Sequence, residues 1–214
     1  MSKYLLILFL LVGCVQDSAD TVTPELVETV DVELVAHRGI GTKDNTIVSF
    51  TNALNLGFTS LETDLRMQGG EVVLAHDKTI SNQEYLSLKD FLIFASNNDA
   101  RVWLEAKETE TIKSTLELLK MHNLDVVFMS YRQGDIDLIN SLSPGTITGL
   151  VITKASQIDS MVADWAVISR QLLTSNYEKI KHLKIGVWTI TEQQQYDGVS
   201  HLIDAAIADI QLTQ

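Results

Sequence analysis

The sequence contains a set of side chains that can together bind a metal ion, transfer protons and hold phosphate. They fall between residues 37 and 107 and comprise His37, Arg38, Glu62, Asp64, His76, Glu105 and Lys107. Carboxylates bind hard divalent cations, imidazoles transfer protons near neutral pH, and guanidinium and ammonium groups bind phosphate oxygens. This combination indicates metal-assisted cleavage of a phosphodiester.

The acids occur in two short patterns, Glu62-x-Asp64 and Glu105-x-Lys107. Side chains two residues apart point to the same face of a strand, so each pair can act on one ligand. Three carboxylates form an oxygen-rich site, which favours Ca²⁺ or Mg²⁺ over Zn²⁺. We therefore interpret Glu62, Asp64 and Glu105 as candidate metal ligands.

The remaining candidates act on protons, phosphate and the substrate alcohol. His37 and His76 are expected to form the acid/base pair, and Arg38 and Lys107 to bind phosphate. Trp188 is expected to line the pocket rather than the core, because an aromatic wall suits the carbon face of a polyol. Each signal alone has a plainer explanation, such as a solvated strand edge, a surface turn or a cross-strand salt bridge. The functional interpretation depends on their falling at the ends of successive strands.

Short β-rich segments alternate with helical patterns from residue 33 onward. Strands are predicted at 33–36, 60–65, 72–75, 101–106, 126–130, 148–152, 166–169, 184–190 and 205–208, and helices at 45–56, 87–96, 111–122, 135–142 and near 156–162, 174–183 and 192–200. About eight βα units predict an α/β fold, a closed (β/α)₈ TIM barrel, with an open doubly wound sheet as the alternative. The barrel would be compact and would lack the final helix.

Composition predicts one barrel domain over residues 32–214. The chain has 214 residues, of which 45% are hydrophobic, and a formal net charge of -12. A chain this acidic is not expected to bind nucleic acid, which requires a basic surface. Its expected partners are a small-molecule substrate and, through the N-terminus, a membrane.

The first residues resemble a bacterial lipoprotein signal. Lys3 precedes an apolar run that is too short to span a bilayer, and Leu11-Val12-Gly13-Cys14 resembles a lipobox. The resemblance implies a signal peptide over 1–13, lipidation of Cys14 and a tether over 14–31. It also implies a lipid-anchored protein of the bacterial cell envelope, on the periplasmic face of the outer membrane. An ordinary signal peptide or a buried cysteine is the alternative.

The motifs as a group resemble the glycerophosphodiester phosphodiesterase family. They are His37-Arg38-Gly39, Asn45-Thr46, Leu61-Glu62-x-Asp64-Leu65, His76-Asp77, Leu104-Glu105-Ala106-Lys107 and Val187-Trp188-Thr189-Ile190. The resemblance implies a TIM barrel that hydrolyses glycerophosphodiesters to glycerol 3-phosphate and an alcohol with a divalent cation. It also implies the same roles for the candidate residues as those given above.

Three departures from the family pattern bear on function. Asp44 stands where the family usually has a longer glutamate. Only residues 78–104 separate the His-Asp motif from Glu105, so the usual inserted subdomain is missing and the mouth should be more open. The missing final helix should leave one flank of the barrel for residues 24–31 or a partner to cover. The alternatives are a phospholipase-like enzyme acting on lysolipids and an inactive barrel that binds a phosphorylated ligand.

Overall fold

A computed structural model of the chain describes residues 31–214, and the predicted signal peptide, Cys14 and most of the tether lie outside the described residues. The strands are β1 (Glu33–His37), β2 (Ser60–Gln68), β3 (Glu71–Leu74), β4 (Arg101–Ala106), β5 (Val126–Ser130), β6 (Ile147–Ile152), β7 (Trp165–Ser169), β8 (Lys184–Ile190) and β9 (Ala205–Ala208). The α-helices are α1 (Ile47–Asn55), α2 (Leu88–Asn97), α3 (Thr111–Leu119), α4 (Gln133–Leu142), α5 (Arg170–Ile180) and α6 (Gln193–Asp197).

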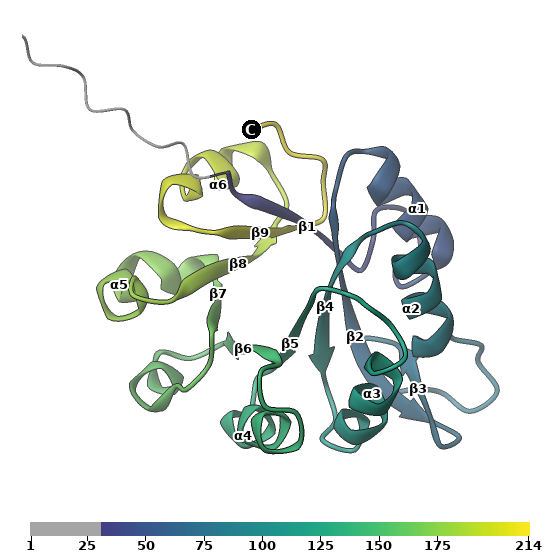
Figure 1. The fold of residues 1–214 in the computed structure, drawn as a ribbon. Helices are drawn as coiled ribbons and strands as arrows, with labels where there is room; N and C mark the ends of the chain where they lie inside the picture. The colour runs from purple at the N-terminus through teal and green to yellow at the C-terminus, as the bar shows by residue number, and fades with distance from the viewer. Residues whose placement is uncertain (1–30) are drawn as a thin grey trace, which may run out of the picture.

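Eight of these strands are parallel and close into a barrel with the helices outside it (Figure 1). The barrel closes because β1 pairs in parallel with both β2 and β9. The predicted TIM barrel is therefore confirmed, and the open doubly wound sheet is excluded. Since parallel strands all end at the same rim, the barrel brings residues that follow different strands to one mouth.

Strand β3 differs from the other predicted strands. It pairs antiparallel with β2, through a turn at Gly69 and Gly70, and takes no part in barrel closure. The β2–β3 hairpin therefore extends β2 beyond the barrel rim and returns the chain toward the mouth. Its last residue, Leu74, lies two residues before His76.

Two layers of apolar side chains hold the barrel together. The outer layer lies between the strands and the helices. The inner layer fills the barrel and consists of Val35, Trp103, Val127, Met129, Val151, Trp165, Val167, Ala205 and Ile207. The rings of Trp103 and Trp165 meet edge to face, with centroids 4.7 Å apart. Gly186 packs beside this pair, where a Cβ would lie 3.4 Å from the Trp103 ring.

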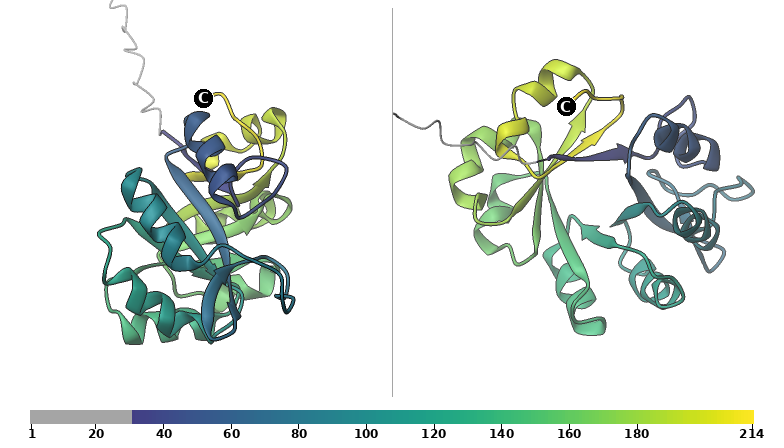
Figure 2. Two further views of the ribbon diagram at one scale, coloured as in Figure 1. Left: turned by 90° about the vertical axis from the view of Figure 1, so that its right-hand side faces the viewer. Right: turned by 45° about the horizontal axis from the view of Figure 1, so that its top comes forward.

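Apart from α5, the helical segments that follow β6 are shorter than the helices that cover the first half of the barrel (Figure 2). The predicted helix near 156–162 is a 3₁₀ helix, η1 (Ala155–Ser160), and the one at 192–200 is divided between α6 and the 3₁₀ helix η2 (Ser200–Leu202). Among the described residues no helix follows β9, as predicted. None of the described helices has the length and apolar character needed to cross a bilayer.

The C-terminal segment covers the flank that the missing helix would leave bare. Leu212 is buried in the core, and Gln193 exchanges two hydrogen bonds with the backbone of Thr213. Gln211 donates a hydrogen bond to the carbonyl of Leu56 at the end of α1. Residues 210–214 therefore fill a place that we expected residues 24–31 or a partner to fill.

Candidate active site

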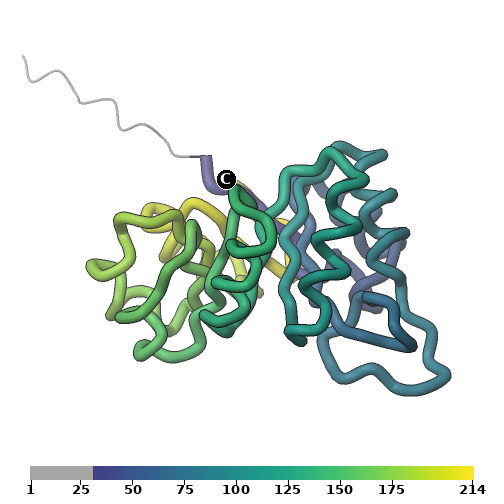
Figure 3. Tube along the Cα trace, turned by 60° about the horizontal axis from the view of Figure 1, so that its bottom comes forward, coloured from purple at the N-terminus to yellow at the C-terminus, as the bar shows by residue number. Residues whose placement is uncertain are grey.

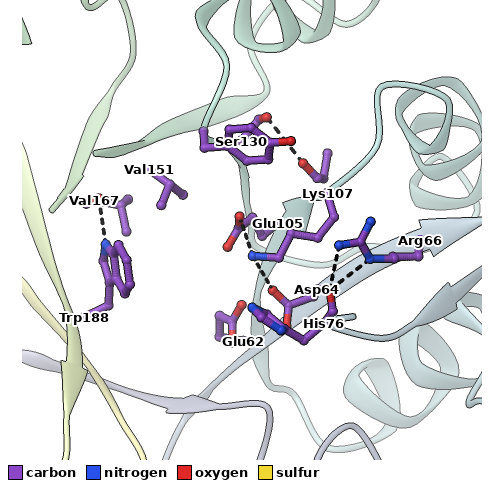
Figure 4. Close-up of polar contacts among 12 residues, drawn as sticks. Glu62, Asp64, Arg66, His76, Glu105, Lys107, Ser130, Val151, Val167 and Trp188 are labelled. Atoms are coloured by element: carbon purple, nitrogen blue, oxygen red, sulfur yellow. Dashed lines mark hydrogen bonds and ion pairs between the residues drawn. The ribbon is translucent and has the colours of Figure 1, made fainter. Parts of the chain in front are cut away.

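The three predicted metal ligands meet at the carboxyl ends of neighbouring strands. Glu62 and Asp64 belong to β2 and Glu105 belongs to β4, where Asp64 and Glu105 are register partners. One oxygen of each carboxylate lies within 4.8 Å of the others. All three residues are buried, and Figure 4 shows them turned toward one point.

Two basic side chains contact this acidic cluster. Arg38 Nε lies 2.8 Å from one oxygen of Asp64, and Lys107 Nζ lies 2.9 Å from the other. Lys107 also donates a hydrogen bond of 2.7 Å to Glu105. Although the Asp64 contacts are close, neither has hydrogen-bond geometry, so both buried oxygens of Asp64 accept no hydrogen bond within residues 31–214. Buried oxygens without donors, beside two further carboxylates, fit a hard divalent cation.

Burial makes the negative charge of the cluster costly. It raises the pKa of Glu62 to about 8, and the neighbouring charge of Asp64 adds to this effect. Burial also raises the pKa of Glu105, again with a contribution from Asp64, although Lys107 opposes the shift. Negative charges held close together and away from water disfavour ionisation of Glu62 and Glu105. A bound cation would offset this electrostatic cost.

His37 is held by a partner that the sequence analysis did not identify. Its Nδ1 lies 2.6 Å from Asp209, which directly follows β9, and its Nε2 lies 4.0 Å from Glu62. Burial alone would lower the pKa of His37, but the hydrogen bond to Asp209 and the charge of Glu62 raise it above its ordinary value. The position of Asp209 at a strand end was the available signal, and closure of β9 onto β1 brings it to His37.

His76 is positioned through its backbone as well as its ring. Its carbonyl accepts two hydrogen bonds from Arg66 on β2, of 2.9 Å from Nε and 2.8 Å from the terminal guanidinium (Figure 4). Arg66 is held in turn by Glu108, which also accepts a hydrogen bond from the backbone N–H of Met67. Nδ1 of His76 lies 2.9 Å from Asp77. The sequence analysis missed Arg66 and Glu108 because their effect on His76 depends on the β2–β3 hairpin.

The loop after β1 is held in a specific shape that presents Arg38. The backbone of Arg38 is left-handed, with φ of 57°. Its N–H donates hydrogen bonds to the backbone carbonyl and to the side-chain carboxylate of Glu62. Gly39 follows with φ of 78°, and a Cβ there would lie 2.6 Å from the backbone of Ser49. Only glycine allows that approach of α1 to the loop. Asp44, the departure from the family pattern, has a carboxylate oxygen 3.8 Å from the Arg38 guanidinium.

A cavity of about 270 Å³ lies beside the cluster and has an apolar wall on the opposite side. That wall comes from β5, β6, β7, β8 and β9 and consists of Met129, Val151, Val167, Trp188 and Ile207. The Trp188 indole donates a hydrogen bond of 3.1 Å to the carbonyl of Val167, which fixes its ring (Figure 4). Trp188 thus lines the cavity, at a cis peptide bond with Thr189.

A further buried acid, Asp135 on α4, stabilises the rim where β5 connects to α4. It accepts hydrogen bonds from Ser130, Thr109 and Arg132, and these interactions lower its pKa although burial would raise it. The Arg132 guanidinium lies 4.5 Å from the ring centroid of Tyr131, which lines the cavity. This network, which the sequence analysis did not identify, joins β5, the loop before α3, and α4 at the rim.

No family model matches the sequence, and a search of curated proteins finds no matching relative. Solved structures share the fold. A glycerophosphodiester phosphodiesterase from Thermotoga maritima is 22% identical, with a TM-score of 0.71 over 83% of this chain and 94% of that one. An Oleispira antarctica phosphodiesterase, in complex with the product sn-glycerol-3-phosphate, is 20% identical, with a TM-score of 0.72 over 84% and 93%. A glycerophosphodiester phosphodiesterase from Parabacteroides distasonis is 17% identical, with a TM-score of 0.73 over 86% and 94%.

Proposed function

We propose that this chain is a glycerophosphodiester phosphodiesterase that uses a divalent cation to hydrolyse glycerophosphodiesters to glycerol 3-phosphate and an alcohol. The observation that carries the proposal is a buried cluster of three carboxylates at the carboxyl rim of the barrel, beside a cavity that both imidazoles line. The shared fold supports it, since the neighbouring structures are phosphodiesterases and one contains glycerol 3-phosphate.

Glu62, Asp64 and Glu105 would hold the cation. An oxygen-only ligand set favours Ca²⁺ or Mg²⁺. When bound, the ion would supply Lewis-acid polarisation of the phosphoryl group and compensate the charge of the buried carboxylates. Arg38 and Lys107 contact the same cluster, so their remaining N–H groups are placed to bind phosphate oxygens.

Each histidine has one ring nitrogen engaged and the other available. Asp209 binds Nδ1 of His37, which leaves Nε2 toward the acidic cluster. Asp77 binds Nδ1 of His76 in the same way. A carboxylate on one nitrogen fixes the orientation and tautomer of the ring, so the free nitrogen can accept or donate a proton. Two such imidazoles, on different elements, provide both a base and an acid.

The test is metal-dependent release of the alcohol by the purified chain, together with glycerol 3-phosphate from glycerophosphodiesters and lysophosphatidate from lysophospholipids. Glycerophosphocholine, glycerophosphoethanolamine and lysophospholipids are supplied with Ca²⁺, Mg²⁺ or chelator. We expect release from the glycerophosphodiesters only with a cation. His37→Ala should lose at least about 100-fold, since a general base or acid contributes about 10²–10⁴-fold. Glu62→Gln should also lose activity, because it removes one charged ligand of the cation. His182→Ala, which changes an exposed histidine before β8, is the matched control and should retain full activity.

The same assay separates the two alternative functions. Activity restricted to lysophospholipids would replace the proposal with a phospholipase-like enzyme. No release from any substrate, together with retained binding of glycerol 3-phosphate, would replace it with an inactive binding barrel. The complete set of two imidazoles and three acids favours turnover, because a binding protein needs phosphate contacts but has little use for two proton-transfer groups.

A further inference from the structure

A groove opens at the amino end of the barrel, opposite the catalytic mouth. It has a volume of about 660 Å³ and is lined by residues at the starts of β1, β8 and β9, together with residues of α5, α6, η2 and the C-terminal segment. It shares no lining residue with the catalytic cavity, which lies at the carboxyl ends of the strands. We call it the amino-end groove.

The base of this groove is apolar. Its apolar lining residues all belong to, or pack against, the outer layer of the core, and they are Val32, Tyr177, Leu183, Ile185, Leu202 and Ile203. Within residues 31–214 no helix follows β9 to cover this surface. Because removing apolar surface from water is favourable, a segment with an apolar face would gain free energy by covering the groove.

The charges of the groove restrict what can cover it. Its titratable lining residues, tyrosines aside, are Asp31, Lys181, Asp197, His201 and Asp204. Lys181 is paired with Glu178 at 2.6 Å, and Asp204 accepts a hydrogen bond of 2.7 Å from the backbone N–H of Ile185. The three acids leave the groove slightly negative. An occupant must therefore present apolar groups to the groove and turn its own acids toward water.

The chain itself enters the barrel through this groove. Asp31 and Val32, the first described residues, line it. The side chain of the last residue, Gln214, donates a hydrogen bond to the carbonyl of Val32, and Figure 3 shows the start of β1 beside the C-terminus. The residues immediately before Asp31 are thus joined covalently to one edge of the groove. Such a connection gives a segment a high effective concentration at its site.

The sequence just before Asp31 has the pattern of a short amphipathic helix. It reads Thr23-Pro24-Glu25-Leu26-Val27-Glu28-Thr29-Val30. Threonine is a favoured N-cap, proline is a favoured first helical residue, and an acid suits the first turn. At 3.6 residues per turn, Leu26, Val27 and Val30 share one face, and the two glutamates and Thr29 share the opposite face. This pattern meets the requirement that the groove sets.

We propose that residues 24–30 dock as a helix in the amino-end groove, with Leu26, Val27 and Val30 against its apolar base. A helix of this length, about 10 Å, is not stable alone in water, so it folds as it docks. It covers the groove beside the flank that residues 210–214 fill. Docking leaves only residues 15–23 between Cys14 and the barrel, at the end opposite the catalytic mouth. The proposal does not depend on the proposed function.

The first experiment measures amide hydrogen exchange in the purified full chain. The helical hydrogen bonds slow exchange at residues 27–30, and we expect Leu26→Asp to accelerate it at least about tenfold, the effect of losing about 1.4 kcal/mol of docking free energy. The thermal midpoint should fall by roughly 2–4 °C. Thr29→Asp introduces the same acid on the opposite face of the segment. As the matched control, it should change exchange less than about twofold.

The second experiment fills the groove from the barrel side. Ser200, at the start of η2, lines the groove, so Ser200→Trp should displace the segment. We expect exchange at residues 27–30 to become as fast as in Leu26→Asp, while circular dichroism shows an intact barrel. Ser175→Trp, at an exposed position on α5 outside the groove, is the control and should leave this exchange slow.

Three results would overturn the proposal. Fast exchange at residues 27–30 in the unaltered chain would show that no docked helix forms. Slow exchange that persists in Ser200→Trp would place the segment elsewhere. Protection of the groove that survives Leu26→Asp and increases with protein concentration would mean that a second copy of the chain covers it. None of these results affects the test of phosphodiester hydrolysis, so the two proposals can fail separately.

Discussion

At the scale of single residues, the candidate site depends on side chains that hold other side chains. Asp209 orients the ring of His37, and Arg66 holds the backbone of His76. Each contributes charge-assisted hydrogen bonds, which are about twice as strong as neutral ones. The two imidazoles are therefore preorganised by residues outside the metal cluster, and this arrangement matters because small displacements of proton-transfer groups have large effects on rate.

We predict that Arg66 is a positioning residue for His76. Arg66→Lys removes the two-pronged contact to the His76 carbonyl, and we expect kcat to fall about ten- to hundredfold, as a misplaced catalytic group does, with little change in KM. Glu108→Gln, which keeps the length of the side chain that supports Arg66, should lose less activity than Glu108→Ala. Steady-state kinetics across pH provide the measurement, with Arg170→Lys at the start of α5 as control. A fall in kcat that is accompanied by a lower thermal stability, with the same loss in Glu108→Gln and Glu108→Ala, would indicate a purely structural role.

At the scale of elements, strand order decides which residues meet. The β2–β3 hairpin returns the chain to the mouth and delivers His76, while β9 closes onto β1 and delivers Asp209. The connection from β5 to α4 supports the rim through Asp135, which three side chains bind. Each of these three elements therefore contributes one side chain: His76 and Asp209 belong to the site, and Asp135 supports the rim.

The pH dependence of stability should show the contribution of Asp135. Because its pKa is lowered in the folded chain, its ionised form stabilises the fold above about pH 4, the ordinary range for aspartate, and that contribution is lost as pH falls through the lower folded pKa. We expect Asp135→Asn to reduce the free energy of unfolding by about 1–3 kcal/mol at pH 7, as for other buried charge-assisted hydrogen bonds. The difference should shrink toward pH 3 in urea unfolding followed by circular dichroism. Asp137→Asn, on the same helix, is the control, and a difference that grows in acid would contradict the assignment.

At the scale of the whole molecule, residues 31–214 form one barrel, and the lipoprotein signal remains a prediction about residues outside the described part. Cys14 is the only cysteine of the chain and follows the apolar run directly. Several acyl chains on one residue would give firm anchoring, since a single chain gives only marginal membrane binding. We therefore propose a lipid-anchored enzyme on the periplasmic face of the outer membrane.

Metabolic labelling tests this anchor. In a Gram-negative host, labelled palmitate should be incorporated into the full chain and the protein should sediment with outer membranes. Cys14→Ser should abolish both, and Ser18→Ala, in the predicted tether, should change neither. Release of an unlabelled, soluble domain from the unaltered chain would instead indicate an ordinary signal peptide.

The sequence by itself determined the barrel class, nearly all of its strands and the seven residues on which the proposed chemistry depends. This was possible because alternation of β and α segments leaves few architectures, and because residues that follow parallel strands must share one rim. Only the tertiary structure decided that β3 leaves the barrel, that Asp209 and Arg66 hold the two histidines, and that Lys107 reaches Asp64. Those contacts join residues that are distant in sequence or that lie on opposite sides of a turn. Local periodicity carries no information about such pairs, because barrel closure and hairpin geometry set the distance between them.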